Sequence, residues 1–127
     1  MALYVQTSGT LSTNSASFTP INGLAITLPE GVGVTAIIIL NVPFPYATGN
    51  DTPGGSFGIT VNGVMSGVVA GFTYNEPVPQ ASGRVPTTLV AGIPLSNAPQ
   101  TIQAVWSSVR GSNVIIDTPA TLTAIMS

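Results

Sequence analysis

The chain of 127 residues has a formal charge of -2, and only 5% of its residues are charged although 44% are hydrophobic. Its two basic residues cannot form the cationic surface that nucleic acids and anionic membranes attract. The lack of histidine and cysteine excludes disulfides, thiolate nucleophiles, zinc sites and histidine-based catalysis. We expect one domain over residues 1–127, because the length leaves no room for a second core.

Strands dominate the predicted secondary structure. The 14 glycines and 11 prolines are spread along the whole chain and leave few windows long enough for a helix. The segments between them are short and rich in valine, isoleucine and threonine, which is typical of strands. In chain order, the predicted strands are Ala2–Thr7, Leu24–Leu28, Val34–Val42, Phe57–Val61, Val64–Tyr74, Thr87–Leu95, Thr101–Val109, Asn113–Asp117 and Ala120–Met126.

Local patterns refine this prediction. The pair Asn62–Gly63 lies between two strand-forming segments and predicts a type I′ hairpin turn. Polar and apolar residues alternate over Thr101–Trp106 and Thr121–Ile125, as in strands with one buried face. The run Ala36–Leu40 does not alternate, so we expect that strand to be covered on both faces. About nine strands with breaks every 8–12 residues favour an all-β jelly roll or β-sandwich.

The sequence carries no signal for membrane insertion or classical export. The segment Met1–Thr7 has neither a basic n-region nor an apolar h-region. The longest apolar run, Ala36–Leu40, is far shorter than the roughly 20 residues of a membrane-spanning helix. We expect a soluble protein without a signal peptide, which stays in the cytoplasm or leaves the cell by a non-classical route.

The scarcity of charge bears on assembly. Small domains stay apart from their copies mainly through net charge and scattered lysines, and this chain has no lysine. We therefore expect a closed oligomer in which identical subunits bury part of the surface. The alternative is a monomer kept in solution by serine, threonine and asparagine.

The acidic residues offer little chemistry. Glu30, Asp51, Glu76 and Asp117 are isolated in the sequence, so no calcium-binding loop can be written, and a glycosidase pair has no support. The glycine-rich stretch Asp51–Gly55 lacks the lysine and helix of a phosphate-binding loop and indicates a turn. We expect no enzyme activity, no metal and no cofactor.

The two arginines are more informative because they are so few. Arg84 and Arg110 each lie beside a glycine near the predicted end of a strand. Each could be a solvated loop residue, or could pair structurally with Glu76 or Asp117. Alternatively, they bind a ligand, because a guanidinium group carries a rigid fork of donors that can contact two neighbouring oxygens.

Aromatic and hydroxyl side chains could complete a site for a sugar. Tyr46, Thr73 and Tyr74 supply hydroxyls and flat rings, and vicinal sugar hydroxyls and C–H patches are recognised by such a combination with arginine. The other aromatic residues are more typical of a core than of a ligand platform. They are Phe18, Phe44, Phe57, Phe72 and Trp106.

Several runs together carry a family resemblance. They are Ile39–Asn50, Phe72–Tyr74, Ser82–Pro86, Thr88–Ala91, Trp106–Ser112 and Ile116–Ile125, in this order and at similar spacing. Over roughly residues 37–125, the chain resembles the N-terminal domain of a bacterial superlectin, a fucose-binding lectin with a tumour-necrosis-factor-like (TNF-like) fold. The second, calcium-dependent lectin domain of a superlectin has no counterpart in this sequence.

The resemblance implies a jelly-roll homotrimer with three metal-free fucose sites between subunits. The six residues that match the family's sugar site divide between adjoining subunits: Tyr46, Ser82 and Arg84 from one, and Thr73, Tyr74 and Arg110 from the other. The two arginines would then converge on one fucose.

The chain departs from the family pattern at four positions around this site. Ser56 replaces a tyrosine, Gln80 a glutamate, Ala81 a serine and Ser82 a threonine. Because both arginines and the Thr73–Tyr74 pair are present, we expect terminal fucose to bind, whereas the preference among larger oligosaccharides should differ.

These considerations predict a calcium-independent lectin for L-fucose and for fucosylated glycans on cell surfaces. The alternative is a structural or receptor-binding jelly-roll trimer without affinity for sugars. An enzyme that acts on glycans is a weaker third possibility.

Overall fold

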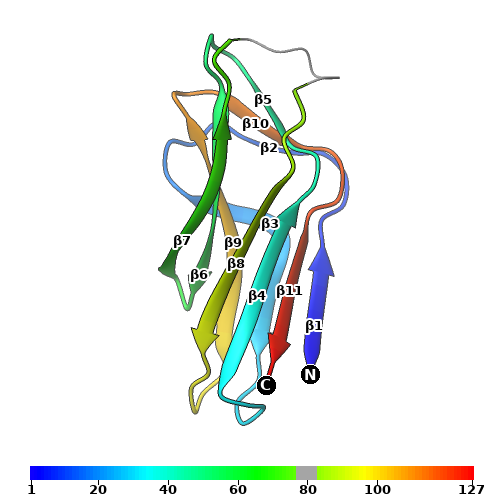
Figure 1. The fold of residues 1–127 in the computed structure, drawn as a ribbon, viewed down its shortest axis with the longest axis vertical. Helices are drawn as coiled ribbons and strands as arrows, with labels where there is room; N and C mark the ends of the chain where they lie inside the picture. The colour runs from blue at the N-terminus through cyan, green and yellow to red at the C-terminus, as the bar shows by residue number, and fades with distance from the viewer. Residues whose placement is uncertain (77–82) are drawn as a thin grey trace.

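The computed structural model describes residues 1–76 and 83–127, and strands connected by turns and loops form this part of the chain (Figure 1). The described residues form eleven strands: β1 (Ala2–Gln6), β2 (Leu11–Thr13), β3 (Thr19–Leu28), β4 (Thr35–Val42), β5 (Tyr46–Thr48), β6 (Gly54–Val61), β7 (Val64–Thr73), β8 (Thr87–Pro94), β9 (Gln100–Val109), β10 (Asn113–Ile116) and β11 (Thr121–Met126). Within the described residues, no helix is long and apolar enough to cross a membrane.

Two four-stranded antiparallel sheets make up most of the molecule. One has the strand order β1-β11-β4-β8 and the other the order β3-β9-β6-β7. Most neighbours within a sheet are distant in sequence, as in the double Greek key of a jelly roll. A small sheet, β2-β10-β5, lies at the end opposite to the two chain termini (Figure 1). The all-β jelly-roll sandwich expected from the sequence is confirmed.

The core lies between the two large sheets and follows the alternation of the strands. In β4, Ala36, Ile38 and Leu40 are buried, whereas Ile37 is 40% exposed and Ile39 is half-buried. The prediction that this strand is covered on both faces is therefore wrong for the single chain, because every second residue of β4 remains exposed or half-buried among the described residues. The outer face of this sheet carries Ile37, Ile39, Val90 and Ile125 among uncharged polar residues.

The start of β6 corrects a second expectation. Gly54 and Gly55, interpreted from the sequence as part of a turn, pair with both β7 and β9. Glycine is required here by close packing, because a Cβ atom would lie 2.3 Å from the Phe72 carbonyl oxygen at Gly54 and 2.8 Å from the Val114 side chain at Gly55. Tertiary contacts thus override the low strand propensity of glycine.

The hairpin turn between β6 and β7 is confirmed. Asn62 and Gly63 have φ angles of 50° and 84°, and these positive values at both central residues fit a type I′ turn. The turn places the far ends of β6 and β7, near Gly54 and Thr73, at the same end of the molecule as the small sheet (Figure 1).

The aromatic residues divide into two groups. Phe57, Phe72 and Trp106 are buried in the core, with the ring of Phe57 6.3 Å from that of Phe72 and 6.5 Å from that of Trp106. Phe18 and Phe44, also expected in the core, are 37% and 45% exposed. Phe18 precedes β3 and Phe44 lies in the connection between β4 and β5, so neither belongs to an inward-facing strand position.

Candidate functional site

Arg84 lies just before β8, and its guanidinium group is held by two oxygen-bearing partners. Nη1 donates to Asp117 Oδ1 over 2.5 Å, and Nη2 donates to Asp117 Oδ2 over 2.9 Å. Nη1 also donates to the Phe44 carbonyl oxygen over 2.9 Å. The side chains of Arg84 and Asp117 are 11% and 25% exposed, so the pair is largely shielded from water. Of the alternatives that the sequence left open for Arg84, the structural pairing with Asp117 is present.

Two aromatic rings also contact this guanidinium group. The Arg84 Cζ atom is 4.2 Å from the centroid of the Tyr46 ring and 4.6 Å from that of the Phe44 ring. Both distances are within the range of cation–π attraction. Phe44 therefore packs on an arginine at the edge of the sandwich, which is the physical reason why it is missing from the core.

Arg84 and Asp117 each favour the charged form of the other. The hydrogen bonds from Arg84 hold the pKa of Asp117 below its ordinary value, and Asp117 in turn raises the pKa of Arg84. Desolvation opposes both effects but is the smaller influence. The ion pair is consequently stable throughout the neutral pH range.

Tyr74 connects the end of β7 to the segment that carries Arg84. Its hydroxyl donates to the Gly83 carbonyl oxygen, and its amide donates to the Pro53 carbonyl oxygen over 2.9 Å. Burial raises the pKa of the Tyr74 hydroxyl, and Arg84 lowers it by a smaller amount. Tyr46, Tyr74 and Arg84 of one chain thus lie close enough to interact electrostatically.

Arg110 has a different environment, in the three-residue connection between β9 and β10. Arg110 and Gly111 have φ angles of 54° and 71°, and the Ser112 amide closes the turn by donating to the Val109 carbonyl oxygen over 3.1 Å. A non-glycine residue in this left-handed conformation is uncommon and needs support from its surroundings.

Asn50 and Thr52 provide that support. Asn50 Nδ2 donates to the Arg110 carbonyl oxygen over 2.8 Å, and Asn50 Oδ1 accepts from the Thr52 amide over 2.8 Å. Arg110 Nε then donates to Thr52 Oγ1 over 2.7 Å and to the Thr52 carbonyl oxygen over 3.1 Å. Among residues 1–76 and 83–127, no hydrogen-bond partner engages the terminal Nη atoms of Arg110, whose side chain is exposed.

The register of β6 connects Arg110 to two other predicted site residues. Gly54 pairs with Thr73 on one side and with Val109, the neighbour of Arg110, on the other. Ser56, two residues further along β6, shares the outer face of this sheet with Thr73, which is exposed. Thr73 at the end of β7, Ser56 on β6 and Arg110 in the turn that follows β9 therefore lie at one end of the sheet.

The remaining predicted residues, Gln80, Ala81 and Ser82, lie outside the described residues. Sequence reasoning did not single out Asn50 and Thr52, although Asn-X-Thr followed by Pro53 and glycine is a local turn signal. The signal predicts the turn but does not reveal that the turn holds an arginine 58 residues away in sequence.

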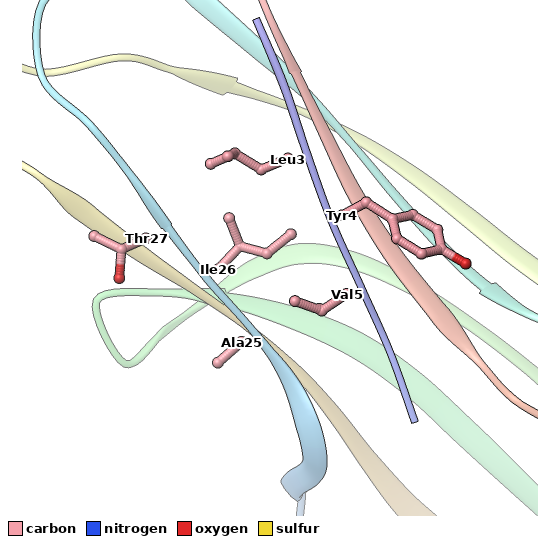
Figure 2. Close-up of a pocket in the computed structure, with 6 residues that line it drawn as sticks. All are labelled: Leu3, Tyr4, Val5, Ala25, Ile26 and Thr27. Carbon is pink, nitrogen blue, oxygen red and sulfur yellow. The ribbon is translucent and has the colours of Figure 1, made fainter. Parts of the chain in front are cut away.

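The structure also contains an open apolar groove of about 250 Å³ between the edge strands β1 and β3. Leu3 and Val5 point from β1 towards Ile26, whereas Tyr4 points to the opposite side of β1 (Figure 2). The described residues that line this groove are uncharged, whereas Arg84 and Arg110 lie at the other end of the molecule, the arginine-bearing end.

The described residues thus form a jelly roll with arginine, tyrosine and threonine side chains gathered at one end. The chain matches the family described as "Bc2l-C, N-terminal domain" over residues 2–125. It belongs to this family of lectin-type, TNF-like domains, and the resemblance drawn from the sequence is confirmed.

Two solved structures have partly similar architecture. The CBM36-1 domain of a multidomain xylanase from the hindgut metagenome of Trinervitermes trinervoides is 14% identical, with a TM-score of 0.48 over 100% of this chain and 98% of that one. Eiger TNF from S. frugiperda is 10% identical, with a TM-score of 0.48 over 99% of this chain and 92% of that one. No curated protein matches the sequence.

Proposed function

We propose that the protein is a calcium-independent lectin that binds L-fucose and fucosylated glycans at sites between the subunits of a homotrimer. Membership of the Bc2l-C N-terminal domain family supports the lectin class. The observation that carries the proposal is the pair of supported arginines, Arg84 and Arg110, together with Tyr46, Tyr74 and Thr73 at one end of the molecule.

The chemistry of these groups suits a neutral sugar. The terminal nitrogens of Arg110 are exposed and Nε is anchored on Thr52, so a donor fork faces solvent in a fixed direction. Such a fork can donate to two vicinal hydroxyl oxygens, and the exposed hydroxyl of Thr73 adds a donor and acceptor on the neighbouring strand. In the proposed arrangement, Arg84, Tyr46 and Ser82 of one subunit face Arg110, Thr73 and Tyr74 of the next.

The outer face of the β1-β11-β4-β8 sheet supports the assembly. Strand register aligns Ile125 with Ile37 and aligns Ile39 with Val90, and Tyr4 belongs to the same face. Ile37, Val90 and Ile125 are between 40% and 55% exposed in the single chain. These apolar residues alternate with threonine and asparagine on an uncharged face, and such a face is suited to burial by other copies. Three sites on one trimer would bind a glycan-covered surface with avidity.

A structural or receptor-binding trimer without sugar affinity is the second candidate. The contact between Arg84 and Asp117 favours it, because a guanidinium group that already has a carboxylate partner can serve stability alone. A glycan array distinguishes the two functions: signals on fucosylated glycans support the lectin, and intact trimers without any signal support the structural protein.

Calorimetric titration of L-fucose into the protein tests the proposal directly, in the presence and absence of a calcium chelator. We expect binding that the chelator does not change and that Arg84→Ala and Arg110→Ala each weaken by about 1.5–3 kcal/mol. Asn97→Ala, in the exposed turn between β8 and β9, is the matched control and should bind like the parent. If an intact trimer releases no heat of binding at millimolar fucose, the protein is not a lectin for fucose.

A further inference from the structure

We propose that Asp117 is a positioning residue of the sugar site, which fixes the plane and direction of the Arg84 guanidinium group before the ligand arrives. This inference rests on the proposed function. It assigns a role to a carboxylate that the family resemblance did not include in the site.

The position of Asp117 follows from the small sheet. Strands β5 and β10 are antiparallel, with Ile115 opposite Tyr46. Asp117 directly follows the last residue of β10, and Phe44 lies two residues before β5 and offers the carbonyl oxygen that accepts from Arg84 Nη1. Both oxygen-bearing partners of Arg84 therefore lie within two residues of the ends of two paired strands.

The backbone next to Arg84 is hydrogen-bonded to the segment that carries Phe44 and Tyr46. The Val85 amide donates to the Pro45 carbonyl oxygen over 3.1 Å, between the two residues whose rings contact the guanidinium group. With its backbone fixed by this hydrogen bond, the Arg84 side chain must reach Asp117 with the two Nη atoms facing the two Oδ atoms. A carboxylate fork facing a guanidinium fork allows only one coplanar arrangement.

This arrangement bears on binding because an arginine side chain has many rotamers. A free guanidinium group loses rotamer entropy when it contacts a ligand, and a group that is already ordered avoids that loss. Removal of the Asp117 charge should therefore weaken sugar binding through Arg84, even though Asp117 itself contacts no sugar. The effect should disappear when residue 84 can no longer form a fork.

Asp117→Asn tests this role, because it keeps the side-chain shape and removes the charge. We expect L-fucose affinity to fall about tenfold, with the trimer and the near-ultraviolet circular dichroism unchanged. Glu30→Gln, which removes one charge from an exposed turn, is the matched control and should stay within twofold of the parent. If Asp117→Asn does not fold, Asp117→Glu replaces it, since this variant keeps the charge but moves the fork by one methylene group.

Two further measurements separate positioning from a general structural role. In the background of Arg84→Lys, which keeps the cation without the fork, Asp117→Asn should change the affinity by less than twofold. Nitrogen-15 NMR of the arginine side chains should show slow rotation of the Arg84 guanidinium group in the parent and fast rotation in Asp117→Asn.

The outcomes distinguish this inference from the proposed function. If Asp117→Asn binds fucose with the parental affinity, the positioning role is wrong but the protein is still a lectin. The same holds if Asp117→Asn lowers the affinity as much in the Arg84→Lys background as in the parent. If Asp117→Glu is the variant used, parental affinity has the same meaning. If the parent shows slow rotation of the Arg84 guanidinium group but binds no fucose, both the lectin function and the positioning role are wrong.

Discussion

Arg110 Nε lies 2.7 Å from Thr52 Oγ1, and this contact determines where the terminal nitrogens of an exposed arginine point. Thr52 is itself held by Asn50, whose amide group contacts the Arg110 backbone from the other side. A closed set of hydrogen bonds thus supports both the left-handed backbone and the side chain of Arg110. Neither Asn50 nor Thr52 needs to touch a sugar in order to affect binding.

Thr52→Val should weaken fucose binding about threefold to tenfold. Valine has nearly the same shape as threonine but removes the Oγ1 acceptor, so the Arg110 side chain loses one of its two anchors while the carbonyl contact remains. A loss of about 0.7–1.4 kcal/mol is in the range of one hydrogen bond. Calorimetry with L-fucose measures the change.

Thr27→Val is the matched control for this prediction. Thr27 is an exposed residue of β3, outside the arginine-bearing end of the molecule. It should leave fucose affinity unchanged. Equal affinities for Thr52→Val and the parent would show that Thr52 does not orient the binding form of Arg110.

Acid unfolding should reflect the Asp117–Arg84 pair. The pKa of Asp117 is lower in the folded chain than its ordinary value of 3.8, chiefly because of the hydrogen bonds from Arg84. A depressed carboxyl pKa contributes stability that is fully present above the unfolded-state pKa and is lost as the pH falls through the folded-state pKa. The free energy of unfolding should therefore decrease below about pH 4, and the slope should be smaller in Asp117→Asn.

Urea unfolding between about pH 2.5 and pH 7 measures this dependence. Glu30→Gln provides the comparison, because the Glu30 carboxyl group is exposed and has no hydrogen-bond partner among the described residues. The free energy of unfolding of Glu30→Gln should vary with pH as it does in the parent. If the same were true of Asp117→Asn, the ion pair would contribute nothing to the acid sensitivity of the fold.

The fold could be predicted largely from local patterns, with failures at identifiable places. Alternation located β9 and β11, and Asn62–Gly63 located a hairpin turn. The three-residue strands β2 and β5 are too short to show a period, so they were missed. The start of β6 was missed because the need for Gly54 and Gly55 arises from neighbouring strands rather than from their own propensity.

The candidate site was less accessible to pattern reasoning. Arg84 and Asp117 are 33 residues apart in sequence, and Arg110 and Thr52 are 58 apart, so no spacing rule could pair them. Asp117 could be named only as one of two possible partners for an arginine. Side-chain chemistry alone singled out Tyr46, Thr73 and Tyr74. The remaining predicted site residues came from family resemblance, which transfers residue positions without the contacts that support them.

Ile37→Lys should convert the proposed trimer into monomers. Ile37 lies on the outer face of the β1-β11-β4-β8 sheet, with Ile125 and Gly92 as its cross-strand neighbours. In the proposed trimer this position would be buried, and neither neighbour could form an ion pair with a lysine. Burial of an unpaired ammonium group costs more than one subunit contact can offset. Light scattering after size-exclusion chromatography measures the mass.

Val64→Lys makes the same change from an apolar residue to a cation at a position that is 70% exposed in the hairpin between β6 and β7. It should leave the mass and the fucose affinity unchanged. For Ile37→Lys we expect both the trimer and fucose binding to be lost, because each proposed site needs two subunits. A trimeric Ile37→Lys would place the subunit contacts on another face.

Ser56→Tyr should raise affinity for fucosylated oligosaccharides about threefold to tenfold. Ser56 pairs with Gly71 on β7 and Ser107 on β9, so its two direct cross-strand partners leave room beside it on the outer face of the sheet. A tyrosine ring can cover Gly71 there and present its face to a sugar, which is worth about 0.5–1.5 kcal/mol. Ser12→Tyr, on the exposed face of β2, should bind like the parent. Since Thr73 and the turn of Arg110 adjoin this position, an intact Ser56→Tyr trimer with unchanged affinity would mean that the bound glycan does not extend across β6.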